Sequence, residues 1–314
     1  MKIFLTILSL LIISPVPVKD NFTIFSSENS DLPENDIWSI SVDTKGNKWI
    51  GTAKSGLVRM NGDEMEVFNS ENSPITGQFL GPIFIDSEKN VWVSQAKPGG
   101  LFKYDGTSWH SYSSDDIKLS KISVIAMCEG PDNIIYIAGG AGISQYDGEK
   151  WSKIQTPKNQ SFTFRAISVS DNGHIAAGHN GGLLIMKNGK WVSYTEENSE
   201  LVNYVRAVHF ADSEKLYVGY GGNKTGGFSI KENDEWTHFN KSNSKLSDNM
   251  VRDIEVGTDG VMWLATNDGL NKIEGGKISS IFFREGVYRN VISDISTEGE
   301  RAWIATNFGV IEVK

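Results

Sequence analysis

The chain contains the stretch Asp43-Thr44-Lys45-Gly46-Asn47-Lys48-Trp49-Ile50-Gly51-Thr52, and versions of this stretch return along its whole length. Each version has one bulky marker residue, and successive markers lie 39 to 46 residues apart: Trp49, Trp92, Tyr136, Ile175, Tyr217, Trp263 and Trp303. A glycine and an apolar residue follow each marker, from Gly56-Leu57 to Gly309-Val310. A repeat of about forty residues with strand-like content is typical of a β-propeller, in which each repeat forms one four-stranded blade. The sequence therefore predicts an all-β, seven-bladed β-propeller.

One repeat carries the strand and turn signals of one blade. In the first repeat, apolar and small residues alternate over residues 37–42, as they do in a half-buried strand. Three more strand-like segments follow, at residues 48–52, 57–60 and 65–68, and Asn61-Gly62 is a hairpin signal between the last two. The aromatic residues of the fourth segment recur at a spacing of three in several repeats, which favours a bulge or an outer edge strand there.

The last repeat lacks its fourth segment, because the chain ends at Lys314 after three strands. A matching segment stands at the other end of the chain, where residues 22–30 resemble residues 65–73 and 236–244. We therefore expect the N-terminal strand to complete the last blade. Such closure removes the open sheet edges that would otherwise pair with other chains.

Composition limits the classes of partner. The chain has 314 residues, a formal net charge of -9 and 39% hydrophobic residues, which fits a globular protein and disfavours nucleic acid or anionic membranes as partners. A single cysteine, Cys128, excludes an intrachain disulfide, and its apolar surroundings indicate a buried strand. We expect a monomer without a cofactor.

The N-terminus has a different character from the repeats. Met1-Lys2 precedes an apolar stretch at residues 3–13, and Ser14-Pro15-Val16-Pro17 follows. A basic start, a short apolar stretch and a break are typical of a secretory signal peptide, and the stretch is too short to span a bilayer comfortably. We predict a signal peptide at residues 1–18, a propeller at residues 19–314, and export to the periplasm or beyond without a transmembrane segment in the mature chain. A buried first strand is the alternative interpretation of this stretch.

The repeat resembles that of the two-component regulator propeller family. The stretch at residues 43–52 matches that family's Asp-x-x-Gly-x-x-Trp-Ile-Gly-Thr pattern, Trp263-Leu264-Ala265-Thr266 and Trp303-Ile304-Ala305-Thr306 match it well, and the family's Asn-Ser linker recurs, for example at Asn72-Ser73. The resemblance covers residues 21–314 and implies a seven-bladed, extracytoplasmic, sensor-like binding module. Receptors of this family often carry two such rings ahead of a membrane helix and a kinase, which this sequence does not show.

Enzymatic alternatives find less support in the residues. The five histidines do not pair at a metal-ligand spacing, and the Asp-x-x-Gly turns lack the further acidic positions of a calcium loop. The repeat is also distantly similar to that of virginiamycin B lyase, but the segments that correspond to that family's catalytic positions are Ala265-Thr266-Asn267 and Ala305-Thr306-Asn307. We predict no catalytic residue and no metal site. A lyase or hydrolase with a site assembled across blades stays the alternative, and convergent carboxylates or histidines at the axis would favour it.

One set of equivalent positions differs among the blades. Counting eleven residues back from the marker, or ten in the fourth blade, gives Trp38, Gly81, Arg165, Arg206, Arg252 and Ile292, with Arg289 just upstream of the last. Equivalent positions on a ring point toward one mouth of the central channel, so three neighbouring blades should place three guanidiniums there, with Trp38 across. That cluster suits a carboxylate, sulfate or phosphate. The alternative is that each arginine pairs with a neighbour such as Asp253 and ties blades together.

These observations favour non-catalytic recognition of a carbohydrate, peptide or protein partner, with an anionic ligand at Arg165, Arg206, Arg252, Trp38 and Arg289. The loops after the second strand of each blade form a second candidate surface: Lys54, Lys97, His179, Asn180, Tyr220, Asn223, Lys224, Asn267, Asn307 and Phe308. Loop variation on a rigid scaffold is typical of a binding face.

Overall fold

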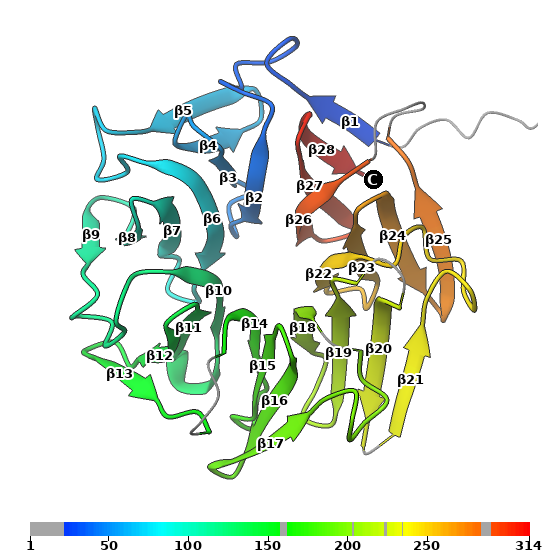
Figure 1. Cartoon of the computed structure of the whole chain (residues 1–314). Helices are drawn as coiled ribbons and strands as arrows, with labels where there is room; N and C mark the ends of the chain where they lie inside the picture. The colour runs from blue at the N-terminus through cyan, green and yellow to red at the C-terminus, as the bar shows by residue number, and fades with distance from the viewer. Residues whose placement is uncertain (1–21, 158–161, 203, 223–224, 234, 284–289) are drawn as a thin grey trace, which may run out of the picture.

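Seven four-stranded antiparallel sheets form a ring, with the first strand of each repeat nearest the centre (Figure 1). The computed structural model describes residues 22–157, 162–202, 204–222, 225–233, 235–283 and 290–314. The predicted signal peptide lies outside these residues. Among the described residues, no helix has the length and apolar character needed to cross a bilayer. The prediction of a seven-bladed propeller is confirmed.

From the innermost strand outward, blade 1 contains β2 (Ile37–Val42), β3 (Lys48–Thr52), β4 (Leu57–Asn61) and β5 (Glu64–Phe68). Blade 2 contains β6 (Gln78–Ile85), β7 (Val91–Lys97), β8 (Gly100–Tyr104) and β9 (Trp109–Tyr112). Blade 3 contains β10 (Val124–Glu129), β11 (Ile135–Gly139), β12 (Gly142–Tyr146) and β13 (Trp151–Ile154), with the short 3-10 helix η1 (Pro131–Asn133) between the first two strands.

Blade 4 contains β14 (Phe164–Val169), β15 (Ile175–His179), β16 (Gly182–Lys187) and β17 (Lys190–Tyr194). Blade 5 contains β18 (Val205–Phe210), β19 (Lys215–Tyr220), β20 (Gly227–Glu232) and β21 (Glu235–Phe239). Blade 6 contains β22 (Val251–Val256), β23 (Met262–Thr266), β24 (Gly269–Glu274) and β25 (Lys277–Ile281). Blade 7 contains β26 (Ile292–Glu298), β27 (Arg301–Thr306), β28 (Gly309–Val313) and, outermost, β1 (Phe22–Phe25).

The N-terminal strand closes the ring as predicted. β1 pairs antiparallel with β28, from Phe22 opposite Val313 to Phe25 opposite Val310. A glycine beside it confirms that β1 replaces an ordinary fourth strand: a Cβ on Gly309 would lie 2.2 Å from the carbonyl oxygen of Phe25, just as a Cβ on Gly56 would lie 2.3 Å from that of Phe68 in blade 1. Both glycines also have positive φ angles, which other residues adopt with difficulty.

The repeated Asp-to-Trp phrase forms a turn that is locked to the marker tryptophan. In blade 2, Asp86 Oδ1 accepts a hydrogen bond from the Asn90 backbone N–H at 2.7 Å, and Asp86 Oδ2 accepts one from Trp92 Nε1 at 2.8 Å. The indole of Trp92 is fully buried. Burying an aromatic side chain removes roughly 200 Å² of surface from water, so the single Asp86 contact lets a large apolar group enter the core without leaving its N–H unpaired.

The apolar core lies between neighbouring blades. Trp49 and Phe68 of blade 1 stack with ring centroids 5.8 Å apart, and Tyr104 and Trp109 of blade 2 pack against Phe68 at 5.7 Å. The fourth strand of each blade is an outer edge strand in continuous register, for example β9 against β8, so its aromatics need no bulge. Each blade therefore depends on its neighbour to cover its apolar face.

Bulges occur in the innermost strands instead. In every blade, the pairing of the innermost strand with the second strand slips near its first residue, for example between Phe164 and Ala166 in blade 4. The residues inside these slips are Trp38, Gly81-Pro82, Ile125, Arg165, Arg206, Arg252 and Ser293. Blade 7 thus contributes Ser293, and the sequence-based choice of Ile292 is wrong because Ile292 is paired with Thr306 and fully buried.

Candidate functional site

The bulges place a set of equivalent residues at one end of the ring axis. We call the face at which the innermost strands begin the upper face, and the face that carries the turns after these strands the lower face. A bulge residue has no partner on the second strand, so its side chain is not committed to the sheet. In blades 4, 5 and 6 this residue is arginine, and we call Arg165, Arg206 and Arg252 the arginine arc.

Two arginines of the arc are held by asparagines in the same way. Arg165 Nε donates to Asn180 Oδ1 at 2.9 Å, and Arg252 Nε donates to Asn267 Oδ1 at 2.7 Å. Each asparagine lies 15 residues after its arginine, in the loop after the second strand. The asparagine therefore occupies the Nε edge of the guanidinium and leaves the two terminal nitrogens available for a bidentate contact with an oxyanion.

Arg206 is held differently. The residue 15 positions after it is Gly221, which has no side chain to offer. Tyr204 lies beside Arg206 instead, and it also lies under Arg165, whose guanidinium carbon is 5.2 Å from the centre of the phenol ring. Burial lowers the pKa of Arg206, and the charge of Arg165 lowers it further, whereas the charge of Tyr204 and a side-chain hydrogen bond with it act in the opposite direction. Burial and then the charge of Arg206 lower the pKa of Arg252.

The arc carries positive charge without a paired carboxylate. Among the residues that the structure describes, none of the three guanidiniums has a carboxylate oxygen within 4.0 Å. Asp253 does not pair with Arg252: its carboxylate accepts hydrogen bonds from the backbone N–H groups of Ile254 and Ile295. Burial and the charge of a neighbouring arginine disfavour the charged forms of Arg206 and Arg252 in the free protein, and a bound anion would relieve that repulsion.

Trp38 lies on the opposite side of the ring from the arc. It belongs to β2, which stands across the centre from β14 and β18 (Figure 1). Its indole is 46% exposed and lies 4.8 Å from the ring of Phe79, and Lys97 Nζ lies 5.4 Å from the same ring. The upper face thus offers an exposed aromatic pair on one side and guanidiniums on the other.

Carboxyl groups line the axis below the arc. Asp294 Oδ2 accepts a hydrogen bond from the backbone N–H of Ile40 at 2.9 Å, as Asp253 does from Ile295 at 3.1 Å. The innermost strand has no partner on its axial edge, so these contacts satisfy N–H groups that would otherwise be unpaired. Asp253 and Asp294 also hydrogen-bond to each other. Burial raises the pKa of both carboxyls, and the charge of Asp253 raises that of Asp294 further, whereas the hydrogen bond with Asp294 acts in the opposite direction on Asp253.

This acidic cluster therefore joins blades 6, 7 and 1, because each aspartate reaches the innermost strand of the next blade. Glu255 completes it: burial and the charge of Asp253 raise the pKa of Glu255 to about 8, and Thr297 donates to its Oε1 at 3.4 Å. Carboxyls do converge at the axis, but the two aspartates are occupied by backbone groups. Within the described part of the chain, no three His, Cys, Asp or Glu side chains are arranged to hold a metal ion.

The rim residues predicted from sequence divide into four groups. Asn180 and Asn267 join the arginine arc, and Lys97 joins Phe79. Three others are buried and do not form a surface: His179, Tyr220 and Phe308. Lys54 and Asn307 are exposed, and Asn223 and Lys224 lie outside the described residues, as does Arg289 of the predicted anion site. Sequence reasoning placed the arginines and the asparagines on two surfaces, whereas the structure makes them one. It missed Tyr204, which stands just before the innermost strand β18, and Phe79, which lies near the start of the innermost strand β6.

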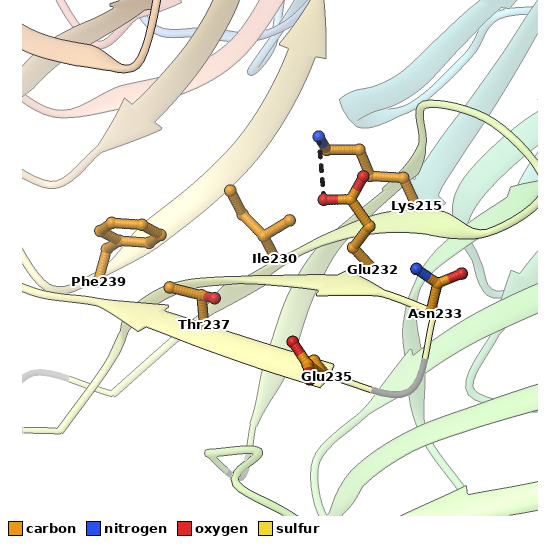
Figure 2. Close-up of a pocket in the computed structure, with 7 residues that line it drawn as sticks. All are labelled: Lys215, Ile230, Glu232, Asn233, Glu235, Thr237 and Phe239. Atoms are coloured by element: carbon orange, nitrogen blue, oxygen red, sulfur yellow. Dashed lines mark ion pairs between the residues drawn. The ribbon is translucent and has the colours of Figure 1, made fainter.

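A pocket of about 280 Å³ lies elsewhere, on the outer strands of blade 5 (Figure 2). Seven residues line it: Lys215, Ile230, Glu232, Asn233, Glu235, Thr237 and Phe239. Its lysine and one of its glutamates already form an ion pair at 3.5 Å, drawn as a dashed line in Figure 2. We do not regard this pocket as the functional site, because its lysine is already paired and it shares no residue with the arginine arc.

Comparison with known proteins shows the fold. The chain matches no protein-family model, and no curated protein is detectably similar in sequence. A catalytically inactive virginiamycin B lyase from Staphylococcus aureus, solved with quinupristin, is 15% identical with a TM-score of 0.75, covering 93% of this chain and 97% of that one. The extracellular domain of BT3049 from B. thetaiotaomicron, named as a hybrid two component system, is 20% identical with a TM-score of 0.75; the match covers 94% of this chain but 42% of that one. YCF48 bound to D1 peptide is 14% identical with a TM-score of 0.68, covering 93% and 96%.

These similarities place the chain among seven-bladed β-propellers, and at such identities they establish the architecture alone. The resemblance to sensor propellers is therefore supported at the level of fold, through extracellular domains of two-component systems. What this chain recognises has to be argued from the arginine arc.

Proposed function

We propose that this protein is an exported, non-catalytic recognition module that binds an anionic ligand or partner at the upper face. The observation that carries the proposal is the arginine arc, in which Arg206 lies within electrostatic range of Arg165 and of Arg252. Two of the three guanidiniums are fixed through Nε by Asn180 and Asn267, and none is paired with a carboxylate among the described residues. Arginines that are already oriented lose little conformational freedom on binding, which favours affinity for an oxyanion.

The rest of the upper face favours a ligand that has a surface for aromatic stacking as well as a negative charge. Trp38 and Phe79 present an exposed aromatic surface across the axis from the arc, and Lys97 adds a further positive charge there. A carbohydrate, a peptide or a protein segment with a carboxylate, sulfate or phosphate group offers both an anion and a face for stacking. The similar fold of YCF48, which is solved with a D1 peptide, supports a peptide or protein as one such partner.

Thermal unfolding with simple oxyanions tests the proposal. Phosphate at ten times its Kd should stabilise the folded protein by about 1.4 kcal/mol. For a protein of this size that corresponds to a rise in Tm of about 2 °C over sodium chloride of equal ionic strength. The triple variant Arg165→Ala/Arg206→Ala/Arg252→Ala should lose this rise.

A charge-matched variant separates the arc from net charge. Lys45, Lys89 and Lys150 are exposed in turns of the lower face, and replacing all three by alanine removes the same three charges. The lysine variant should keep the response to phosphate. A folded triple arginine variant that responds like the wild type would refute the proposed site. Density for a co-purified ligand above the arc, in a structure of protein from its native source, would identify the natural partner.

A further inference from the structure

Tyr204 occupies a constrained place at the centre of the arginine arc. Its backbone is left-handed, with φ at +67°, an uncommon conformation for an aromatic residue. Its N–H donates to the Asn180 carbonyl oxygen at 3.1 Å, and its own carbonyl accepts from the Gly221 N–H at 2.8 Å. The main chain of Tyr204 thus bridges the loops of blades 4 and 5 and fixes where the phenol lies.

The space for the phenol exists because residue 221 is glycine. A Cβ on Gly221 would lie 2.0 Å from Cδ1 and 2.3 Å from Cε1 of Tyr204, and 2.8 Å from Cδ of Arg206. An asparagine at this position, as blades 4 and 6 have at Asn180 and Asn267, would collide with the ring. Blade 5 therefore carries either the rim asparagine or the tyrosine, and not both.

We propose that Tyr204 is the positioning residue of the arginine arc, taking the place of the asparagine that blade 5 lacks and holding Arg206 between Arg165 and Arg252. Its ring lies under the Arg165 guanidinium at 5.2 Å, and the ring packs beside the Arg206 side chain over Gly221, where a Cβ would lie 2.3 Å from Cε1 of Tyr204 and 2.8 Å from Cδ of Arg206. The interaction of the Tyr204 hydroxyl with Arg206 favours the charged guanidinium. One side chain thereby orients two arginines and keeps them apart. Gly221 is required in this arrangement as the space into which the ring fits.

The positioning role predicts that an asparagine in blade 5 can replace Tyr204 and hold Arg206 as asparagines hold Arg165 and Arg252. Tyr204→Phe removes the hydroxyl and keeps the ring under Arg165, so only the hold on Arg206 is lost. Tyr204→Ala removes both. Combining Tyr204→Ala with Gly221→Asn installs in blade 5 the arrangement that holds Arg165 and Arg252, and should restore the orientation of Arg206.

The first readout is the affinity for inorganic phosphate, and this part rests on the proposed function. Tyr204→Phe should raise the Kd about three- to tenfold, which is the expected effect of losing one typical intramolecular hydrogen bond. Tyr204→Ala should raise it further, and the double variant should return it to within about threefold of the wild type. Tyr104→Phe is the matched control, because its exposed hydroxyl binds the Gly106 carbonyl at 2.9 Å in a lower-face hairpin.

The second readout needs no ligand. In ¹⁵N-labelled protein, the guanidinium resonance of Arg206, assigned by its loss in Arg206→Lys, should shift or broaden in Tyr204→Phe and sharpen again in the double variant. An unchanged Arg206 resonance in Tyr204→Phe, or a double variant no better than Tyr204→Ala, overturns the positioning role. If the wild-type protein does not bind phosphate but the Arg206 resonance changes as expected, Tyr204 positions Arg206 and the proposed anion site is wrong.

Discussion

Glu255→Gln should make the protein more stable in mild alkali. The Glu255 carboxyl is packed between the innermost strands of blades 6 and 7, and burial followed by the negative charge of Asp253 raises its pKa from 4.5 to about 8. The unfolded chain therefore loses this proton near pH 4.5, whereas the folded protein keeps it until about pH 8. Stability must fall as pH rises through this interval, because the unfolded state binds fewer protons than the folded state.

The histidines restrict the interval in which this effect can be seen alone. Burial lowers the pKa of His179 to about 4 and also lowers the pKa values of His209 and His238, all from 6.5. Each of them makes stability rise with pH up to about 6.5, which opposes the effect of Glu255. At pH 6.5 their imidazoles are still half protonated in the unfolded state and become largely neutral by about pH 7.5, so comparison of the wild type with Glu255→Gln at each pH removes their contribution. Between pH 6.5 and 8, one proton per molecule at 1.36 kcal/mol per pH unit gives a loss of about 2 kcal/mol from Glu255.

Urea unfolding at several pH values from 6.5 to 8 measures this loss. Glutamine can still accept the hydrogen bond from Thr297, so Glu255→Gln should flatten the decline, and any residual slope belongs to Asp253 and Asp294, whose pKa values are raised in the same direction. The same substitution at exposed Glu71 is the control and should leave the decline unchanged. A wild-type decline from pH 6.5 to 8 that is no steeper than that of Glu255→Gln would refute the reasoning.

Three further outcomes concern the ring itself. Deleting residues up to and including Phe22–Phe25 leaves β28 without its partner strand, and the loss of about 5 kcal/mol of apolar burial should lower the Tm of the whole ring by about 10 °C or more; an unchanged Tm would disprove closure by β1. Gly309→Asn should cost more than 2 kcal/mol in urea unfolding, whereas Gly62→Asn, with no atom within 4 Å of its Cβ and φ at +59°, should cost less than about 1 kcal/mol; equal costs would contradict the packing argument. Asp86→Ala leaves the buried Trp92 Nε1–H unpaired and should cost about 2–3 kcal/mol in urea unfolding. A variant as stable as the wild type would contradict this role of Asp86.

The ring and its closure could be predicted from sequence because both depend on patterns of residues within a single blade. The marker tryptophan, the turn before it and the glycine after it each have a reason inside one blade, such as the Asp86–Trp92 hydrogen bond. The closing strand was recognisable because residues 22–25 must meet the same packing demands as any fourth strand, including the close approach to Gly309. Because every blade has the same packing requirements, the repeats keep similar sequences.

The candidate site could be predicted only in part. The three arginines stand out because equivalent positions in neighbouring blades agree, and the structure brings them together. The bulge that exposes them leaves no sequence mark, so the count misplaced blade 7 at Ile292 instead of Ser293. Tyr204 could not be found by comparing blades, because blades 4 and 6 hold their arginines with an asparagine and blade 5 has none at that position. Only the short distance from a Cβ on Gly221 to the Tyr204 ring shows that the tyrosine takes the place of that asparagine.

Because β1 pairs with β28, the ring can close only after both strands have been synthesised. Phe22 is among the first of the described residues to be synthesised, and Val313, its partner, is the next to last of the chain. Blades 1 to 6 can form as their strands emerge, but β1 has no lasting partner until the final strand is available. The ring is therefore closed only once β28 has been made, and a chain that lacks β28 loses both that strand and the anchorage of β1.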